Sequence, residues 1–135
     1  MSQTLNITKG AIDLGIITRD AAPMVAFYRD VVGLPFEAAI ELPDMGTMHR
    51  LLAGDSVIKI TESEPAADGV PGGIPAASGL RYWTISVEDV DAVAEQITNA
   101  GHPVVIPPRD IRPGVRIAMA TDPDGNWVEF LATTA

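Results

Sequence analysis

The stretch LRYWTISVEDVDAVAEQITNAG, residues 80–101, reads as a strand, a turn and an amphipathic helix in succession. Its opening residues include the aromatic and β-branched types that strands favour. The apolar residues that follow recur at the spacing of one helix face, at Val90, Val93, Ala94 and Ile97. Gly101 suits the position just after a helix. The stretch therefore predicts a strand–helix unit, with Asp89 as a cap or turn residue before the helix.

The same plan occurs once earlier in the chain. AIDLGIIT at 11–18 is apolar and β-rich enough for a buried strand, and Pro23 suits the first turn of a helix. The apolar face of that helix is predicted at Met24, Phe27, Tyr28 and Val31. Gly33 is its natural stop, and Asp20 precedes it as Asp89 precedes the later helix.

Landmark residues of the two copies fall at matching offsets. The strand carrying Lys59 arrives 46 residues after Asp13, and the strand carrying Glu129 arrives 47 residues after Tyr82. A repeat with two copies indicates two modules that pair around one shared concavity. The modules extend over about 11–62 and about 80–131.

Each module continues with three further strands. They are predicted over 35–43, 46–53 and 56–62 in the first module and over 104–107, 116–121 and 127–131 in the second. The segment 63–79 is rich in Pro, Gly and Ala and reads as a surface linker that borders the site. Strands and helices occur in runs, so the sequence predicts an α+β fold in one domain, 1–135. Its two tandem βαβββ modules are expected to form a curved mixed sheet around a shared cavity.

Composition excludes several classes of function. The formal net charge is −9 and the nine basic residues form no cluster, so a nucleic acid would be repelled. The absence of cysteine excludes disulfides, thiolate catalysis and Cys-ligated zinc. No apolar run approaches the roughly 20 residues of a membrane span, and the N-terminus lacks the layout of a signal peptide. We therefore expect a cytoplasmic protein that contacts neither nucleic acid nor membrane.

Three segments carry a resemblance to a known family. They are MVAFYRDVVGLPF at 24–36, SVEDVDAVAEQITNAG at 86–101 and TDPDGNWVEF at 121–130, of which the last is the most specific. With them the chain resembles the glyoxalase / bleomycin-resistance / extradiol-dioxygenase superfamily, whose fold is the vicinal oxygen chelate fold. The resemblance covers nearly all of residues 11–131 and implies a small-molecule substrate or ligand and a homodimer.

The resemblance also implies where a metal would bind. Metal enzymes of the family place one ligand on the first and last strand of each module, and the matching positions here are Asp13, Lys59, Tyr82 and Glu129. Glu129 alone matches the family pattern outright. An ammonium cannot ligate a metal ion and repels one, and a phenol is a poor ligand until it ionises. We therefore expect no metal cofactor, with a divalent ion on Asp13 and Glu129 as the less favoured alternative.

Strand alternation predicts which side chains face the cavity of the first module. If Lys59 faces inward, Val57 and Thr61 do too. A two-residue turn at Gly54-Asp55 places Arg50 opposite Lys59 and therefore also inward. His49 then falls on the helix side, and we expect both it and His102 to be structural.

The same alternation applies to the second module. It places Trp127 beside Glu129, and Thr84 beside Tyr82, on one face. Ala118 is predicted opposite the last strand on this face, where its small side chain leaves space. Trp127 would then form an apolar wall together with Val57 and the alanine.

These predictions combine into a hypothesis of acid–base catalysis on a small, partly apolar carbonyl, epoxide or hydroxy-acid substrate. Asp13 and Glu129 would handle protons, as in an isomerase, lyase or hydrolase. Lys59 and Arg50 would orient the substrate or stabilise oxyanions, and Tyr82 would donate a hydrogen bond. Val57, Thr61, Thr84, Trp127 and Ala118 complete the predicted substrate site.

Other interpretations remain open at this stage. Lys59 and Glu129 can instead form an internal ion pair that ties the modules together, and Tyr82 and Trp127 can be wall residues rather than catalysts. The protein can also be a non-catalytic binder, like the drug-sequestering members of the family it resembles, or a metal-dependent glyoxalase or dioxygenase. Nothing in the residues decides whether the site lies within one chain or across two.

Overall fold

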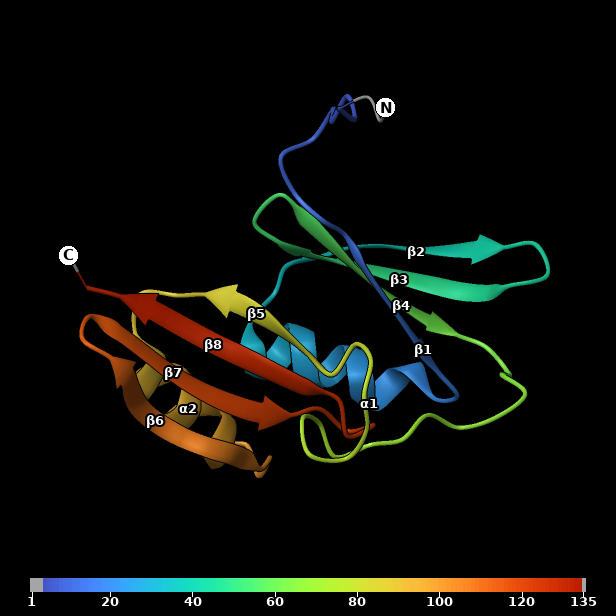
Figure 1. Ribbon diagram of the computed structural model, residues 1–135. Helices are drawn as coiled ribbons and strands as arrows, with labels where there is room; N and C mark the ends of the chain where they lie inside the picture. Colours follow the sequence, from blue (N-terminus) through green and yellow to red (C-terminus); the bar gives the residue numbers. More distant parts are fainter. Residues whose placement is uncertain (1–3, 135) are drawn as a thin grey trace.

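The computed structural model describes residues 4–134 as two strand–helix–strand modules in tandem (Figure 1). The first module consists of β1 Leu14–Thr18, α1 Ala21–Ala26, η1 Phe27–Val32, β2 Phe36–Leu42, β3 Gly46–Ala53 and β4 Ser56–Glu62. The second consists of β5 Tyr82–Ser86, α2 Val90–Asn99, β6 Val104–Arg112, β7 Val115–Thr121 and β8 Trp127–Thr133. The predicted α+β fold with two tandem modules is confirmed.

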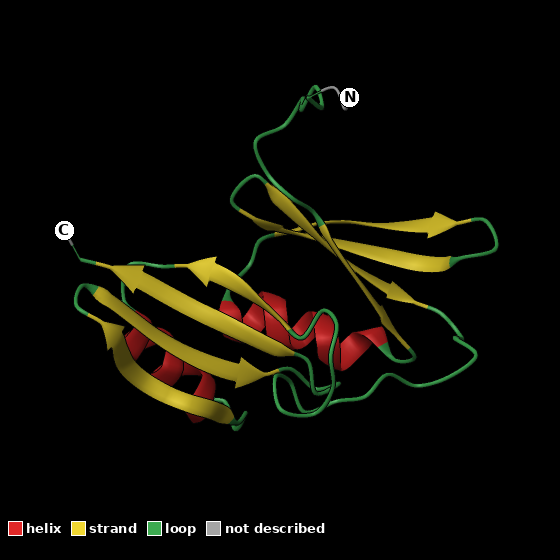
Figure 2. Ribbon diagram, viewed as in Figure 1, coloured by secondary structure: helices red, strands yellow, loops and turns green. Residues whose placement is uncertain are grey.

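Each module forms its own four-stranded mixed sheet, with the strand orders β1-β4-β3-β2 and β5-β8-β7-β6 (Figure 2). In both sheets the first strand of the module pairs in parallel with the last, and the other neighbours are antiparallel. β1 and β5 are therefore edge strands, and each has a free edge in the described structure. Neither helix is long and apolar enough to cross a membrane, as far as residues 4–134 are concerned.

The first helix continues as a π-helical turn, η1, and ends at Gly33 as the sequence predicts. Gly33 has φ of 94°, a left-handed conformation that glycine adopts readily. Asp20 precedes the helix without a side-chain cap, and the carboxylate of Glu62 accepts the Ala21 N–H at 2.9 Å instead. Asp89 does cap α2, since its Oδ1 accepts the Ala92 N–H at 3.0 Å.

The two modules share one apolar core. The first helix lies between the two sheets, where α1 contacts β4 and η1 contacts α2 (Figure 1). The buried residues of this shared core include Met24, Phe27, Leu51, Ile58 and Ile60 from the first module and Ile97, Val128 and Phe130 from the second. Burial of apolar side chains from both modules fixes the orientation of the sheets relative to each other.

A buried hydrogen bond joins the modules inside this core. Tyr28 is fully buried on η1, and its hydroxyl donates to Oδ2 of Asp122 at 2.7 Å. The other carboxylate oxygen of Asp122 accepts the N–H groups of Asp124 and Asn126 at 2.9 and 3.0 Å. Asp122 thus holds the turn that leads into β8 and ties that turn to the first helix.

Candidate functional site

The first sheet presents a set of side chains on the face turned away from the helices. Arg50 pairs with Lys59 in the β3–β4 register, as the two-residue turn predicts. Val57 and Thr61 lie on the same face of β4, whereas Ile58 and Ile60 belong to the shared core. We call the set Arg50, Val57, Lys59 and Thr61 the Lys59 face.

Two cations lie on the Lys59 face, and they differ in their partners. Arg50 is paired with Glu37 across β2 and β3, with 2.6 Å between Nε and Oε1. Lys59 has no hydrogen bond or ion pair with any residue that the structure describes. His49 pairs with the core residue Ile60 in the strand register, so it lies on the helix side as predicted. Lys59 is therefore the cation of this face that is available to a ligand.

Asp13 lies just before β1 and is held by two neighbours. Its Oδ1 accepts a hydrogen bond from the Lys9 ammonium at 2.7 Å and from the Val57 N–H at 2.8 Å. The bond from Lys9, followed by that from the Val57 N–H, lowers the pKa of Asp13, against a smaller opposing effect of burial. The carboxylate thus fastens the start of β1 to β4, and this geometry favours a structural role over the predicted proton-handling one.

The second sheet places four predicted site residues on one face. Glu129 is 9% exposed on β8, and its Oε1 accepts a hydrogen bond from the Thr84 hydroxyl at 2.7 Å. Thr84 is its register partner on β5, and Tyr82 is the register partner of Trp127. Tyr82 is half exposed, at 50%. Because alternate strand residues share a face, these four side chains lie together, as predicted.

The prediction for Ala118 is wrong. The β7–β8 register places Met119 opposite Glu129 and Ala118 opposite Phe130, which belongs to the core. Ala118 therefore packs against Val90 and Ala94 of α2. The cause is the turn between the strands, which contains five residues, 122–126, and so shifts the facing residue by one position. Counting those turn residues would have identified Met119, which is 5% exposed, as the neighbour of Glu129. We call the set Tyr82, Thr84, Met119, Trp127 and Glu129 the Glu129 face.

The two faces are not joined within the described chain. The alternative of an internal Lys59–Glu129 ion pair is wrong, because the structure contains no salt bridge between these residues. Figure 1 shows why: the faces belong to separate sheets, with the first helix between them. One chain therefore carries two separate faces, one with the cation of Lys59 and one with the carboxylate of Glu129.

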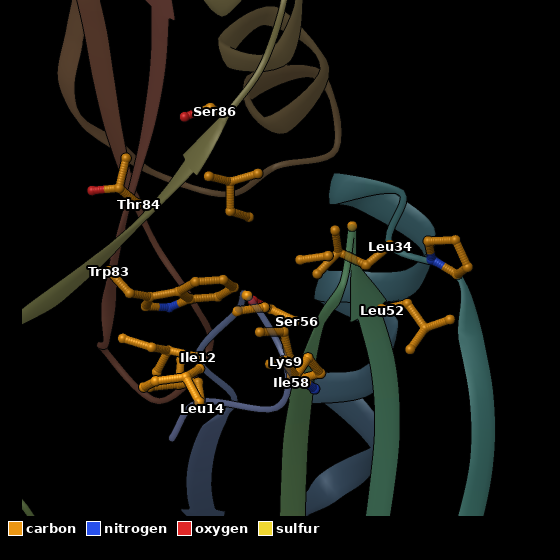
Figure 3. A pocket seen from close by; sticks show the side chains of 17 residues that line it. Lys9, Ile12, Leu14, Leu34, Leu52, Ser56, Ile58, Trp83, Thr84 and Ser86 are labelled. Atoms are coloured by element: carbon orange, nitrogen blue, oxygen red, sulfur yellow. The ribbon is translucent and has the colours of Figure 1, made fainter. Parts of the chain in front are cut away.

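A cleft of about 920 Å³ lies between the modules, and the two faces contribute only Thr84 to its lining. Its walls are mostly apolar side chains from the helix side of both sheets, including Leu14, Leu34, Ile58, Trp83 and Ile85. Thr84 is the only predicted site residue along it, and in Figure 3 the side chains of Thr84 and Ser86 point away from Leu34 and Ile58. The cleft is thus lined mainly by apolar side chains, and Lys59 and Glu129 do not line it.

Comparison with protein families matches the sequence model described as Glyoxalase/Bleomycin resistance protein/Dioxygenase superfamily to residues 10–130. The chain belongs to this superfamily. A glyoxylase-type protein of Mycobacterium tuberculosis (strain CDC 1551 / Oshkosh), CFP32, is 30% identical over 112 residues. That match covers 80% of this chain and 40% of CFP32, so the chain spans well under half of its relative's length.

Solved structures of other proteins have the same fold. The glyoxalase family protein APC24694 from Bacillus cereus superposes with a TM-score of 0.79 at 15% identity, and the match covers 100% of both chains. TnmS3, an antibiotic binding protein from Streptomyces sp. CB03234, superposes with a TM-score of 0.72 at 20% identity. That match covers 96% of this chain and 100% of TnmS3. These similarities extend over both modules and the linker between them.

The four positions at which metal enzymes of the superfamily carry ligands do not fit a divalent cation in this chain. They hold Asp13, Lys59, Tyr82 and Glu129, of which only two are anionic oxygen donors. The Asp13 carboxylate is bound to the Lys9 ammonium. Residues 4–134 contain no cluster of three or more His, Cys, Asp or Glu side chains that could hold a metal ion.

Proposed function

We propose that this superfamily protein binds a small, partly apolar organic molecule on the Glu129 face, with Glu129 as the acceptor for a hydroxyl or ammonium group. The observation that carries the proposal is the burial of the Glu129 carboxylate with the Thr84 hydroxyl as its one hydrogen-bond donor in the described structure. A carboxylate can accept about four hydrogen bonds. The second oxygen of Glu129 is not fully buried, since the indole nitrogen of Trp83 is the one fully buried, unpaired side-chain atom among residues 4–134. A ligand with a donor group would supply the missing partners.

The neighbours of Glu129 define the rest of the ligand. Met119 and Trp127 offer apolar surface beside the carboxylate, and Tyr82 adds a half-exposed aromatic ring. Such a face combines apolar side chains with one oriented polar group, as small-molecule sites do. The ligand is therefore mainly apolar, with a single donor directed at Glu129.

Binding without catalysis is the function that the geometry supports best. The acid–base hypothesis drawn from the sequence assigns proton transfer to Asp13 and Glu129 together, and Asp13 is bound to Lys9 and to the Val57 N–H. The similarity of fold to TnmS3, which is described as an antibiotic binding protein, is compatible with a binding role. The proposal thus places this chain among the ligand-binding rather than the metal-dependent members of the superfamily.

Pairs of ligands that differ only at the donor test this proposal. We expect a small hydroxylated apolar molecule to raise the melting temperature, and its O-methyl ether to bind about 10-fold more weakly, because a hydrogen bond to a charged group contributes about 1.5–3 kcal/mol. Isothermal titration calorimetry measures both affinities. Equal affinities for alcohols and their ethers, across several such pairs, would rule out Glu129 as the anchor.

Proton transfer by Glu129 is the second candidate function. A buried carboxylate hydrogen-bonded to a hydroxyl is suited to act as a general base toward a bound carbon acid. Incubation of carbonyl ligands with the protein in D₂O distinguishes the two functions. Deuterium incorporation next to the carbonyl, detected by NMR, indicates catalysis, whereas ligand recovered unchanged indicates binding.

We further propose that the complete site forms between two copies of the chain, with the Lys59 face of one copy opposite the Glu129 face of the other. Three observations support this arrangement: the faces are separate within one chain, the edge strands β1 and β5 have free edges, and large aliphatic residues beside these edges are exposed. Ile12, just before β1, is 87% exposed, and Leu80, just before β5, is 98% exposed. Exposed apolar surface beside an open sheet edge is typical of an interface.

Sedimentation velocity tests the two-copy site. We expect a dimer for the unmodified protein and a shift toward monomer for Ile12→Lys, because a charge at that position would be buried between the copies. Val105→Lys is the control, since Val105 is exposed on β6, at the far edge of the second sheet. A monomer at every concentration, or equal dissociation of both variants, would contradict a shared site.

A further inference from the structure

The linker between the modules packs directly on the candidate site. Gly73 is buried, and a Cβ added to it would lie 2.0, 2.2 and 2.4 Å from Cδ2, Cε2 and Cγ of Trp127. These three atoms belong to the indole ring, so the backbone of Gly73 lies against the ring itself. Gly73 also has φ of +63°. Only glycine, which has no side chain and tolerates this conformation, fits so close to the ring.

The segment that carries Gly73, residues 70–76, is fastened at the end of the second sheet where the parallel strands β5 and β8 begin. Arg81, just before β5, donates from Nε to the carbonyl of Gly73 and from Nη2 to the carbonyl of Val70, both at 2.8 Å. Pro71 packs against Gly125 in the turn before β8. A Cβ added to Gly125 would lie 2.6 Å from the Cβ of Pro71. The 70–76 segment is thus a fixed support behind Trp127 rather than a loose connection.

Trp127 lies opposite a second aromatic residue on the Glu129 face. Its register partner is Tyr82, and neighbouring strands lie about 4.8 Å apart. Glu129 follows two residues along the same strand face, a separation of about 7 Å. A planar ligand that contacts the two rings can therefore direct a donor at the carboxylate without spanning a large distance.

We infer that the 70–76 segment sets the ligand specificity of the Glu129 face, because Gly73 and Arg81 fix the Trp127 ring for contact with a planar aromatic molecule that carries a hydrogen-bond donor. This inference rests on the proposed binding function and adds the chemical class of the ligand. Gly73 and Arg81 are positioning residues in this arrangement, since they act through Trp127. Trp127 and Tyr82 would contact the ligand, and Glu129 would accept its donor.

Three probes of similar size test the class of ligand in the unmodified protein. They are 2-naphthol, its non-aromatic counterpart decahydro-2-naphthol, and its ether 2-methoxynaphthalene. We expect 2-naphthol to bind about 3- to 10-fold more tightly than decahydro-2-naphthol, because aromatic pairs gain energy beyond their buried area. Equal affinities for these two, or no binding of 2-naphthol, would overturn the inference. Equal affinities for 2-naphthol and the ether would instead contradict Glu129 as the anchor and leave the aromatic specificity in place.

Substitutions in the segment test how the specificity arises. We expect Gly73→Ala to shift the indole NMR signal of Trp127 and to remove the preference for 2-naphthol over decahydro-2-naphthol. Gly69→Ala is the matched control, because a Cβ there meets nothing within 4 Å. Arg81→Gln provides a second variant that adds no steric clash, and it should weaken the same preference. A preference that persists in folded Gly73→Ala and Arg81→Gln proteins would show that the segment only connects the modules.

Discussion

Replacing Asp122 by alanine is expected to lower the free energy of unfolding by about 3 kcal/mol. Asp122 is 3% exposed and is the acceptor for the buried Tyr28 hydroxyl. Its removal leaves that hydroxyl without a partner and releases the N–H groups of Asp124 and Asn126. Because the bond to Tyr28 spans both modules, the loss affects their mutual orientation as well as the turn.

Urea denaturation monitored by circular dichroism measures this loss. Asp124→Ala is the control, since Asp124 lies in the same turn but its side chain is exposed and takes part in no hydrogen bond of the described structure. Tyr28→Phe completes a double-mutant cycle, in which a coupling energy of about 1 kcal/mol or more is expected for groups in direct contact. Equal losses for Asp122→Ala and Asp124→Ala would mean that the turn is not a structural junction.

Tyr28 also predicts how stability depends on alkaline pH. Burial, followed by the negative charge of Asp122, raises the pKa of Tyr28 well above its usual value of 10. In the unfolded chain the phenol loses its proton above about pH 10, while the folded protein retains it. The free energy of unfolding therefore falls as the pH rises through this range. Tyr28→Phe should reduce that fall, measured by urea denaturation at a series of alkaline pH values; the same fall in this variant as in the unmodified protein would contradict the assignment to Tyr28.

The sequence predicts the features of this fold that depend on local patterns. The repeat, the helix end at Gly33 and the facing of Arg50 and Lys59 all follow from periodicity and turn length, and the structure contains each of them. β6 extends to Arg112, beyond the predicted end at 107, because Pro107 and Pro108 lie on the outer edge strand, where a missing N–H is tolerated. Ala118 is wrongly placed for a local reason as well, since the five-residue turn changes which residues face each other.

The features that the sequence does not predict depend on contacts between distant segments. Tyr28 and Asp122 are 94 residues apart, and neither periodicity nor turn chemistry indicates that they meet. Asp13 occupies a ligand position of the superfamily, but its role depends on the ammonium of Lys9 and the N–H of Val57. The contact of Gly73 with Trp127 likewise requires the path of the linker, which has no periodic pattern.

Replacing Glu129 by glutamine is expected to weaken the binding of hydroxylated or ammonium ligands by about 10- to 100-fold, because a charge-assisted hydrogen bond becomes a neutral one. The fold should be unaffected, since glutamine has nearly the same shape and its carbonyl can still accept the Thr84 hydroxyl, which lies 2.7 Å from Glu129. Any proton transfer by this residue should also be lost, because an amide cannot act as a general base.

Isothermal titration calorimetry with 2-naphthol, together with urea denaturation, separates these effects for Glu129→Gln. Glu41→Gln is the control, because Glu41 is exposed on β2 and the same change there alters only the net charge. Thr84→Val should have a smaller effect in the same direction, since it removes the donor that orients the carboxylate but keeps the charge. If Glu129→Gln binds as tightly as Glu41→Gln, the buried carboxylate has a structural role and the ligand lies elsewhere on the protein.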